Sequence, residues 1–191
     1  MTVIFETERL FIRLAIIDDA EMICALWNDP RIMTNVGFSY GLNITPEKIC
    51  KDIEKWGTDP FKQLLIVEKK ADRQAIGQCV MRRPDESGIS ETDIKLLPAF
   101  WGQKYGVEVK RGLLDYLFSH TDCASVQATP NVNNVASIKM QEAVGGIQVG
   151  EETFEFPESM RRFTTPVHHY IYRVFREEWE KRRKWSLPEL L

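Results

Sequence analysis

The segment 101–107 (WGQKYGV) constrains the fold most, because a strand pattern runs into it and a helical pattern runs out of it. Residues 89–97 have the pattern of a strand that ends at Pro98, and an apolar stripe at helical spacing follows at 113–118. A glycine-containing loop between a strand and a helix turns backbone N–H groups and the helix dipole toward one point. The pattern is neither a P-loop nor G-x-G-x-x-G. It predicts an anion-binding turn or, equally, an ordinary strand-to-helix turn with two useful glycines.

The other patterns predict a single mixed α/β domain over residues 1–191. The first helix is expected to begin at an Asp18 cap, and the second at a Thr45 cap with Pro46 in its first position. Two strand-like runs with a charged connection predict an antiparallel hairpin. The expected strands are 10–14, 64–68, 75–81, 89–97, 125–129, 147–154 and 168–174, and the later helices cover 113–118, 135–144 and 176–185.

Charge and cysteine usage narrow the class of protein. A formal net charge of -3 argues against a nucleic-acid partner, since such proteins usually carry a strong basic excess. The 4 cysteines are scattered, with no C-x-x-C pair and no histidine at ligand spacing, so they predict reduced thiols and no metal site. Glu6 and Glu8 stand where a signal peptide needs an apolar core, and no run approaches ~20 apolar residues. We therefore expect a cytoplasmic protein that binds neither nucleic acid nor membrane.

Four pieces of the sequence, in order, resemble the GNAT N-acetyltransferases, and particularly the branch that contains the ribosomal-protein-alanine N-acetyltransferases. Residues 6–14 (ETERLFIRL) look like the first strand of that branch, and 27–30 (WNDP) look like the end of its first helix. Residues 97–108 (LPAFWGQKYGVE) are similar to its acetyl-CoA loop, and 134–139 (NVASIK) to its second cofactor motif. The resemblance implies a mostly antiparallel sheet with one parallel pair flanking the cofactor, and helices on both faces.

The resemblance also implies acetyl-CoA as the co-substrate, with no metal. In such enzymes the pantetheine arm lies along the strand before the loop, and the pyrophosphate accepts main-chain N–H bonds from the loop and the helix start. Lys104 stands where the family commonly has glycine, which predicts an altered loop backbone or an added positive charge beside the phosphates. The implied cofactor-binding residues are Ile94, Leu96, Leu97, Gln103, Lys104, Tyr105, Gly106, Val107, Asn134 and Ser137.

The expected reaction is direct attack of a neutral amine on the acetyl thioester. Ser137 matches a serine that protonates the departing thiolate in related enzymes, while the tyrosine that many members use falls near Gln141 here. Asp93 and Glu91 share one face of the expected strand, so periodicity does not choose between them as the base. Each residue also has a structural alternative: Ser137 as a helix-surface serine, the acids as solvated strand residues, and Asn134 as a helix cap.

An aromatic and basic border is expected around the acceptor pocket. The segment 154–166 is long for a hairpin connection and mixes aromatic with basic side chains. The acceptor is expected to be a small-molecule amine or a peptide amine such as a protein N-terminus. The alternatives are a non-catalytic acetyl-CoA-binding or protein-interaction module, and an enzyme that transfers a longer acyl group. The candidate substrate-binding residues are Trp27, Asn35, Phe38, Phe154 and Arg161.

The C-terminal segment leaves the oligomeric state open between a monomer and a homodimer. Trp179, Trp185 and residues 187–191 offer apolar groups. These groups predict docking either against the domain itself or against a second subunit.

Overall fold

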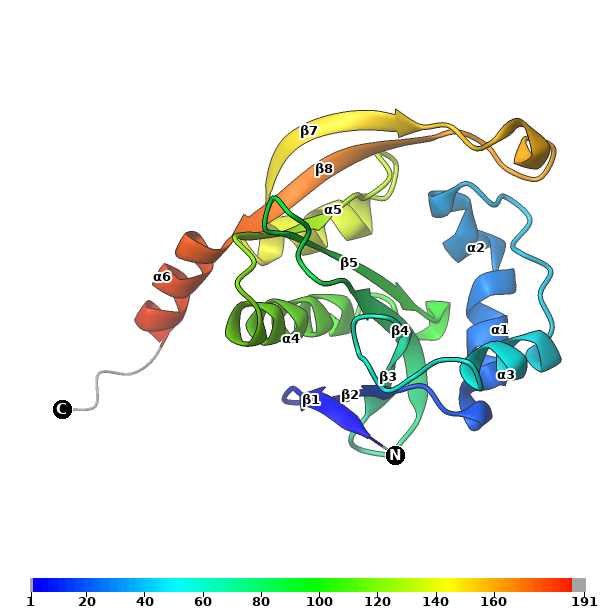
Figure 1. Cartoon of the computed structure of the whole chain (residues 1–191), viewed down its shortest axis with the longest axis horizontal. Helices are drawn as coiled ribbons and strands as arrows, with labels where there is room; N and C mark the ends of the chain where they lie inside the picture. Colours follow the sequence, from blue (N-terminus) through cyan, green and yellow to red (C-terminus); the bar gives the residue numbers. More distant parts are fainter. Residues whose placement is uncertain (1, 187–191) are drawn as a thin grey trace.

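The computed structural model describes residues 2–186 and places eight strands in one sheet (Figure 1). The strand order is β1-β2-β3-β4-β5-β6-β8-β7. β5 pairs with β6 in parallel, and every other neighbouring pair in the described chain is antiparallel, so the expected fold class is confirmed. The strands are β1 (Val3–Glu6), β2 (Leu10–Leu14), β3 (Leu65–Lys69), β4 (Ala75–Met81), β5 (Ile89–Leu96), β6 (Ser125–Ala128), β7 (Ile147–Phe154) and β8 (Val167–Phe175).

Helices cover both faces of the sheet (Figure 1). α1 and α3 pack through Ile23 and Ile49 against Ile66, and α4 packs through Leu113 against the opposite face, where Val67 lies. Both interfaces bury aliphatic side chains completely, which is the main driving force for this arrangement. The helices are α1 (Ala20–Asn28), α2 (Pro30–Met33), α3 (Pro46–Ile53), α4 (Tyr105–His120), α5 (Val135–Ala143) and α6 (Arg176–Ser186), with 3₁₀ turns at Ile17–Asp19, Thr34–Val36, Pro98–Phe100 and Glu158–Met160.

The expected order of elements is confirmed, with one added strand (β1), one added short helix (α2) and one wrong cap. β1 was not expected, because it has four residues and its outer two are exposed. Asp18 does not cap α1: it lies in a 3₁₀ turn, and the helix begins at Ala20 without a side-chain cap. Thr45 caps α3 as expected, since its side chain accepts the Lys48 N–H at 3.4 Å.

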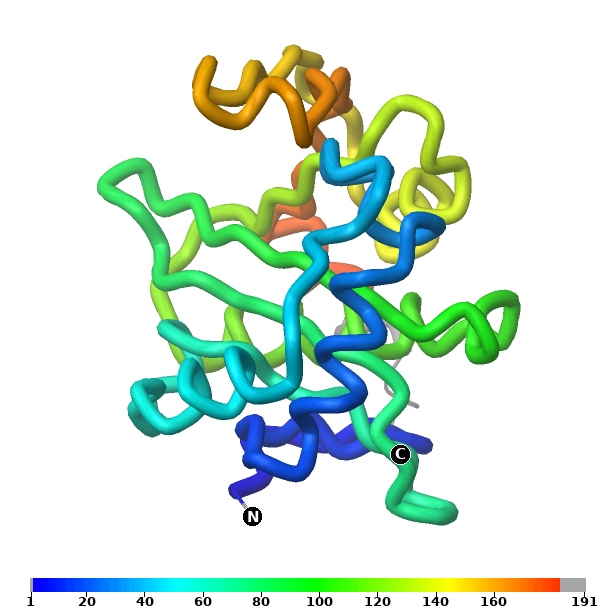
Figure 2. Tube along the Cα trace, turned by 90° about the vertical axis from the view of Figure 1, so that its right-hand side faces the viewer, coloured from blue at the N-terminus to red at the C-terminus, as the bar shows by residue number. Residues whose placement is uncertain are grey.

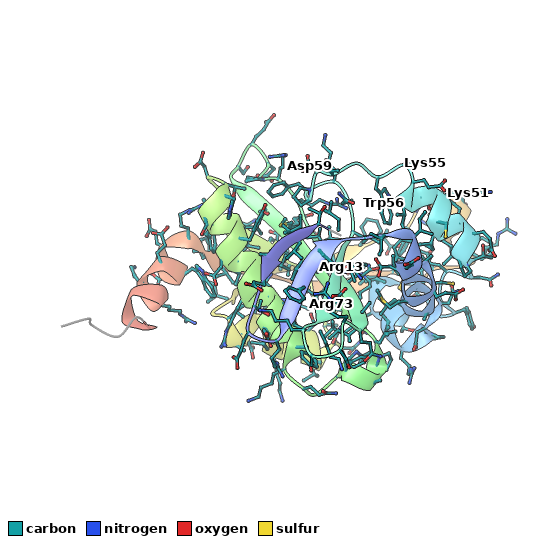
Figure 3. The ribbon with its side chains drawn as sticks, turned by 90° about the horizontal axis from the view of Figure 1, so that it is seen from below. Arg13, Lys51, Lys55, Trp56, Asp59 and Arg73 are labelled. Atoms are coloured by element: carbon teal, nitrogen blue, oxygen red, sulfur yellow. The ribbon has the colours of Figure 1, made fainter. Side chains whose placement is uncertain are left out.

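A buried ion cluster joins β2, β3 and the turn before α1. Arg13 donates to Glu68 at 2.5 Å and to both oxygens of Asp19 at 2.7 Å. Arg73 binds the second Glu68 oxygen at 2.7 Å, and Figure 3 shows the two arginines together on this side of the molecule. Because each buried carboxylate meets a guanidinium, the charges compensate one another inside the fold.

α6 docks against the body of the molecule. Trp179 is buried in the main core, and its Nε1 donates to Asp115 of α4 at 3.1 Å. Trp179 therefore docks against its own domain and not against a second subunit. The side chain of Trp185 and residues 187–191 lie outside the part of the chain that the structure describes.

β5 and β6 pair only over a short stretch. The last paired residues are Glu91 and Gln127, while β5 continues beside β4 as far as Leu96. The two parallel strands therefore part after Glu91. Within the described chain, this leaves the second half of β5 with an open edge on its β6 side.

Candidate active site

The parting of β5 and β6 opens into a cleft of about 2040 Å³, lined by β5, the first turns of α4, the turn after β6 and the first turns of α5. The main chain of Glu91 and that of Leu97 both bond to the β4 side at 2.9 Å. By the alternation of an antiparallel ladder, the N–H groups of Ile94 and Leu96 point the other way, toward the cleft. The side chain of Leu97 packs against the α1–α2 side instead.

The loop before α4 has the backbone shape of a tight turn. Gly102 has φ 75°, and Lys104 has φ 63° and ψ 9°, so both are left-handed. The Glu108 N–H makes a bond of 3.1 Å to the Lys104 carbonyl. The N–H groups of residues 105–107 precede that bond in the first turn of α4, where a helix lacks internal acceptors. All three residues line the cleft, so the helix presents these donors to it.

The turn between β1 and β2 braces this loop. Glu108 accepts hydrogen bonds from Thr7 Oγ1 at 2.6 Å and from the Arg9 main chain at 2.8 Å, and the Arg9 guanidinium donates both to Glu108 and to the Gln103 carbonyl. Burial acts to raise the pKa of Glu108, but the hydrogen bonds from Thr7 and Arg9 lower the pKa overall. The donors of the loop are therefore held in place before any ligand binds.

The two candidate bases lie together, as expected, on one face of β5. Asp93 stands opposite Val80, which packs with the α1–α3 cluster, so both acids face that side of the sheet and both line the cleft. Lys95 donates to Asp93, whereas Gln127 Nε2 donates to Glu91 at 3.4 Å. One acid is thus paired with a cation and the other with a neutral amide.

The start of α5 forms the opposite wall. Asn134 caps this helix, because its Oδ1 accepts the Ser137 N–H at 3.1 Å. Both residues line the cleft, which leaves the capping role of Asn134 compatible with a ligand role. Ser137 lies in the first turn, and Gln141, where many related enzymes have a tyrosine, is buried one turn later.

One cleft residue was missed from the sequence. Lys110 of α4 is only 1% exposed, and its Nζ donates to Thr92 Oγ1 at 2.6 Å; that hydroxyl lies 3.4 Å from the Gln127 carbonyl. Burial lowers the pKa of Lys110 to about 7, against an opposing effect of Asp93. Its helical spacing could have indicated its burial, because Lys110 lies on the same helical face as the apolar stripe at 113–117.

Of the expected acceptor residues, Asn35 lines the cleft. Phe38 and Phe154 both pack edge-on against Phe156, with ring centroids 5.4 and 4.9 Å apart. They therefore brace the loops beside the cleft rather than line it. Figure 2 shows the β7–β8 connection, in orange, next to the loop that follows α2.

The other two acceptor candidates lie farther out. Trp27 packs over β4, and its Nε1 donates to Gln78 at 2.9 Å. Arg161 is exposed at the end of the turn Glu158–Met160. The two loops are joined by the Thr165 N–H, which donates to the Gly37 carbonyl at 2.9 Å.

Among residues 2–186, no group of three or more His, Cys, Asp or Glu side chains is arranged to hold a metal ion. No helix in that span combines the length and apolar character needed to cross a membrane.

Comparison with known proteins gives the family. The model of the acetyltransferase (GNAT) domain matches residues 9–147, so the chain belongs to the GNAT acetyltransferase family. An uncharacterized N-acetyltransferase, p20, of Bacillus licheniformis is 26% identical over 139 residues, which are 70% of this chain and 76% of the relative. The resemblance seen in the sequence is thereby confirmed, and with it the enzyme class.

Solved structures of the same fold include enzymes with different acceptors. The spermidine N-acetyltransferase from Vibrio cholerae in complex with CoA and spermine is similar with a TM-score of 0.71 and 19% identity, over 90% of this chain and 98% of that one. The ribosomal-protein-S5-alanine acetyltransferase from Vibrio fischeri is similar with a TM-score of 0.72 and 16% identity, over 92% and 97%. At these identities the likeness establishes the fold.

Proposed function

We propose that this protein transfers the acetyl group of acetyl-CoA to a primary amine, on a small molecule or at a protein N-terminus. The observation that carries the proposal is the open edge of β5 leading directly into the left-handed turn and N-terminus of α4, within one cleft. A strand edge binds amides through its main chain, and a helix N-terminus binds phosphate. When bound, acetyl-CoA supplies the thioester that the amine attacks.

The residues of the cleft fit that co-substrate. The N–H groups of Ile94 and Leu96 are the donors for a pantetheine arm, and those of residues 103–107 are the donors for the pyrophosphate. The side chain of Lys104 adds a positive charge at the same turn, and Asn134 closes the opposite wall. Main-chain donors fixed before binding cost little reorganisation, which supports catalysis by positioning.

The other roles in the proposed reaction are to accept a proton from the amine, to donate one to the thiolate and to admit the acceptor. Glu91 or Asp93 accepts the proton of the acceptor amine, because both carboxylates face the α1 side of the cleft. The opposite wall offers the Ser137 hydroxyl as a candidate proton donor. The acceptor then enters past Asn35, which lines the cleft, beside the two joined loops, where Phe154 and Arg161 lie.

We also propose a primary amine as the acceptor and the cytoplasm as the compartment. Relatives of this fold include a spermidine enzyme and a ribosomal-protein enzyme, and both acceptors present a primary amine. The described cysteines carry free thiols, which supports a reducing compartment such as the cytoplasm.

Thermal unfolding tests the co-substrate site. Acetyl-CoA or CoA at about a hundred times its dissociation constant is expected to add ~2.7 kcal/mol, a rise of roughly 5 to 11 °C at this chain length, while ATP gives no rise. Lys104→Glu should weaken the shift, because it places a negative charge at the anion turn. Lys62→Glu makes the same charge change on an exposed residue outside the cleft and should leave the shift intact.

Turnover separates the enzyme from a binding module. Incubation with acetyl-CoA and a panel of polyamines and Ala- or Ser-starting peptides should release free thiol in proportion to acetylated amine. A thermal shift without thiol release from any amine would favour the non-catalytic module. Faster release from a longer acyl-CoA would favour the alternative acyl donor.

A further inference from the structure

Lys110 and Thr92 form a polar pair beneath the cleft, at the point where β5 and β6 part. The Lys110 Nζ donates to Thr92 Oγ1 at 2.6 Å, and the Thr92 hydroxyl is directed at the Gln127 carbonyl, 3.4 Å away. Gln127 is the last residue of β6 that pairs with β5. The pair therefore lies at the closed end of the gap between the two strands.

The position of this pair follows the course of the proposed pantetheine arm. From the turn at 103–107 the arm runs back along β5 past Leu96 and Ile94, and the strand gap closes at Glu91. The reacting end of the arm therefore comes to rest beside Thr92. Since neighbouring residues of a strand face opposite ways, Thr92 faces α4 while Glu91 and Asp93 face α1.

We propose that Thr92, in place of Ser137, protonates the thiolate that leaves during acetyl transfer, and that Lys110 positions the Thr92 hydroxyl and resupplies its proton. This inference rests on the proposed acetyl-transfer function. The carbon–sulfur bond breaks, the Thr92 O–H proton passes to the sulfur, and an ammonium proton of Lys110 passes to Thr92 Oγ1. Lys110 is left as a neutral amine, and water that enters after product release returns its proton.

The surroundings of Lys110 suit this role. Burial lowers the pKa of Lys110 to about 7, close to the value at which a group gives and takes protons most effectively near neutral pH. Among the described groups, Asp93 is the one with a resolved electrostatic effect on it. The charged residues on α4 and on the elements packed against it are Glu6, Glu91, Asp93, Lys95, Glu108, Arg111, Asp115, Lys139 and Glu142.

The first experiment measures the pH titration of Lys110 directly and needs no turnover. In protein labelled with ¹³C-lysine, the Cε signal of Lys110 is assigned by its absence from Lys110→Met and is followed against pH. Bound CoA should alter the titration of Lys110, because the thiol ionises beside the pair as pH rises and its thiolate favours the ammonium form. Desulfo-CoA, which lacks the thiol, should leave it unchanged. The same titration with both ligands would overturn the proposal.

The second experiment reads the pH profile of kcat. Wild-type kcat should fall as pH rises through the pKa of Lys110. Lys110→Met and Thr92→Val should lower kcat on the order of 100-fold and lose this alkaline fall, while Thr92→Ser, which keeps the hydroxyl, should recover most of the rate. A profile in Lys110→Met that keeps the wild-type shape would also overturn the proposal.

Failure of this proposal is distinguishable from failure of the proposed function. Thermal shifts with acetyl-CoA establish that each variant is folded and binds the co-substrate. An active wild type with unaltered profiles in the variants removes only the role of the pair. A wild type that binds CoA but shows no difference between CoA and desulfo-CoA at Lys110 removes the pair even if no acceptor amine is found.

Discussion

Lys104 holds a backbone conformation that its own side chain disfavours. Its φ of 63° lies in the left-handed region, where a residue with a Cβ is strained by about 1 to 2 kcal/mol relative to glycine. The neighbouring Gln103 carbonyl is held by Arg9, and Glu108 closes the first helical turn onto Lys104. The loop therefore keeps its shape because contacts on either side determine it, and the lysine contributes charge at a cost in strain.

Two substitutions of Lys104 distinguish the effect of its backbone strain from the effect of its charge. Lys104→Gly and Lys104→Ala remove the same ammonium, but only glycine relieves the left-handed strain. We expect the glycine variant to be more stable than the alanine variant by about 1 kcal/mol, part of the strain relief being offset by the greater freedom of glycine in the unfolded chain. Urea unfolding of both variants measures the difference. Equal stabilities would show that the loop does not hold the left-handed conformation in solution.

Lys110 makes the stability of the protein depend on pH in an unusual direction. Its pKa is about 7 in the folded chain and 10.5 in the reference state, so between these values the unfolded chain binds more protons. The free energy of unfolding should therefore rise with pH across this window. At about 1.4 kcal/mol per pH unit, the full rise from this group is roughly 5 kcal/mol.

Lys110→Met tests that dependence, since methionine fills a similar volume without a titrating group. The variant should be more stable than the wild type near pH 6, and the gap should narrow toward pH 10. Urea unfolding over this pH range measures both curves, with Lys62→Met as the exposed control. Parallel curves for the wild type and Lys110→Met would contradict a burial-shifted lysine.

At the scale of elements, the side chain of Asn134 caps the N-terminus of helix α5, which faces the cleft. Asn134 Oδ1 accepts the Ser137 N–H at 3.1 Å. Asn134→Ala should lower the free energy of unfolding by about 1 kcal/mol, and Asn134→Ser should restore most of it, because serine also caps well. Urea unfolding measures the stabilities, and the acetyl-CoA thermal shift is recorded alongside. If Asn134→Ala loses the thermal shift but no stability, the side chain serves the ligand and not the helix.

The elements were predictable wherever local chemistry determined them. Pro98 and the following glycine ended one strand and opened α4, and β4 and β7 have the bounds expected from their strand-like runs. β1 escaped prediction because its pairing with β2 is a tertiary contact, and its short, half-exposed pattern carries little periodic signal. Asp18 misled because the adjacent Asp19 binds Arg13 instead of capping the helix, which a local pattern does not reveal.

The residues that line the cleft were predictable where they come from local motifs, and much less where loops assemble the proposed acceptor side. The turn at 103–107 and the cap at Asn134 are local motifs, and both line the cleft. Phe38 and Phe154 come from loops far apart in the sequence, and their packing against Phe156 is a tertiary outcome. Chemistry that depends on a local backbone shape can therefore be predicted from the chain, whereas a pocket assembled by loops needs the fold.

At the scale of the whole molecule, one guanidinium ties the C-terminal helix to the far end of α4. Arg176 donates to the carbonyls of Phe118, Thr121 and Cys123 at 2.6, 2.7 and 2.8 Å. These carbonyls belong to the end of α4 and the connection to β6. A cation at a helix C-terminus also favours the helix dipole. Arg176 thus fixes the connection that sets β6 beside β5, and through it the closed end of the cleft.

Arg176→Lys tests how much the three hydrogen bonds of the Arg176 guanidinium contribute to the stability of the fold. A lysine keeps the charge but gathers its donors on one nitrogen, whereas the three carbonyls bind three separate guanidinium nitrogens, so we expect at least one carbonyl to lose its partner. We expect a loss of about 2 kcal/mol in the free energy of unfolding, since hydrogen bonds to a charged donor contribute about 1.5 to 3 kcal/mol each. Lys181→Ala is the matched control: it removes an exposed ion pair with Glu178 and should cost at most about 0.5 kcal/mol. Because the connection leads directly into β6, Arg176→Lys should also reduce the thermal shift with acetyl-CoA, whereas Lys181→Ala should not. A destabilised variant with an undiminished shift would show that the gap between β5 and β6 is set within the sheet, independently of the C-terminal helix.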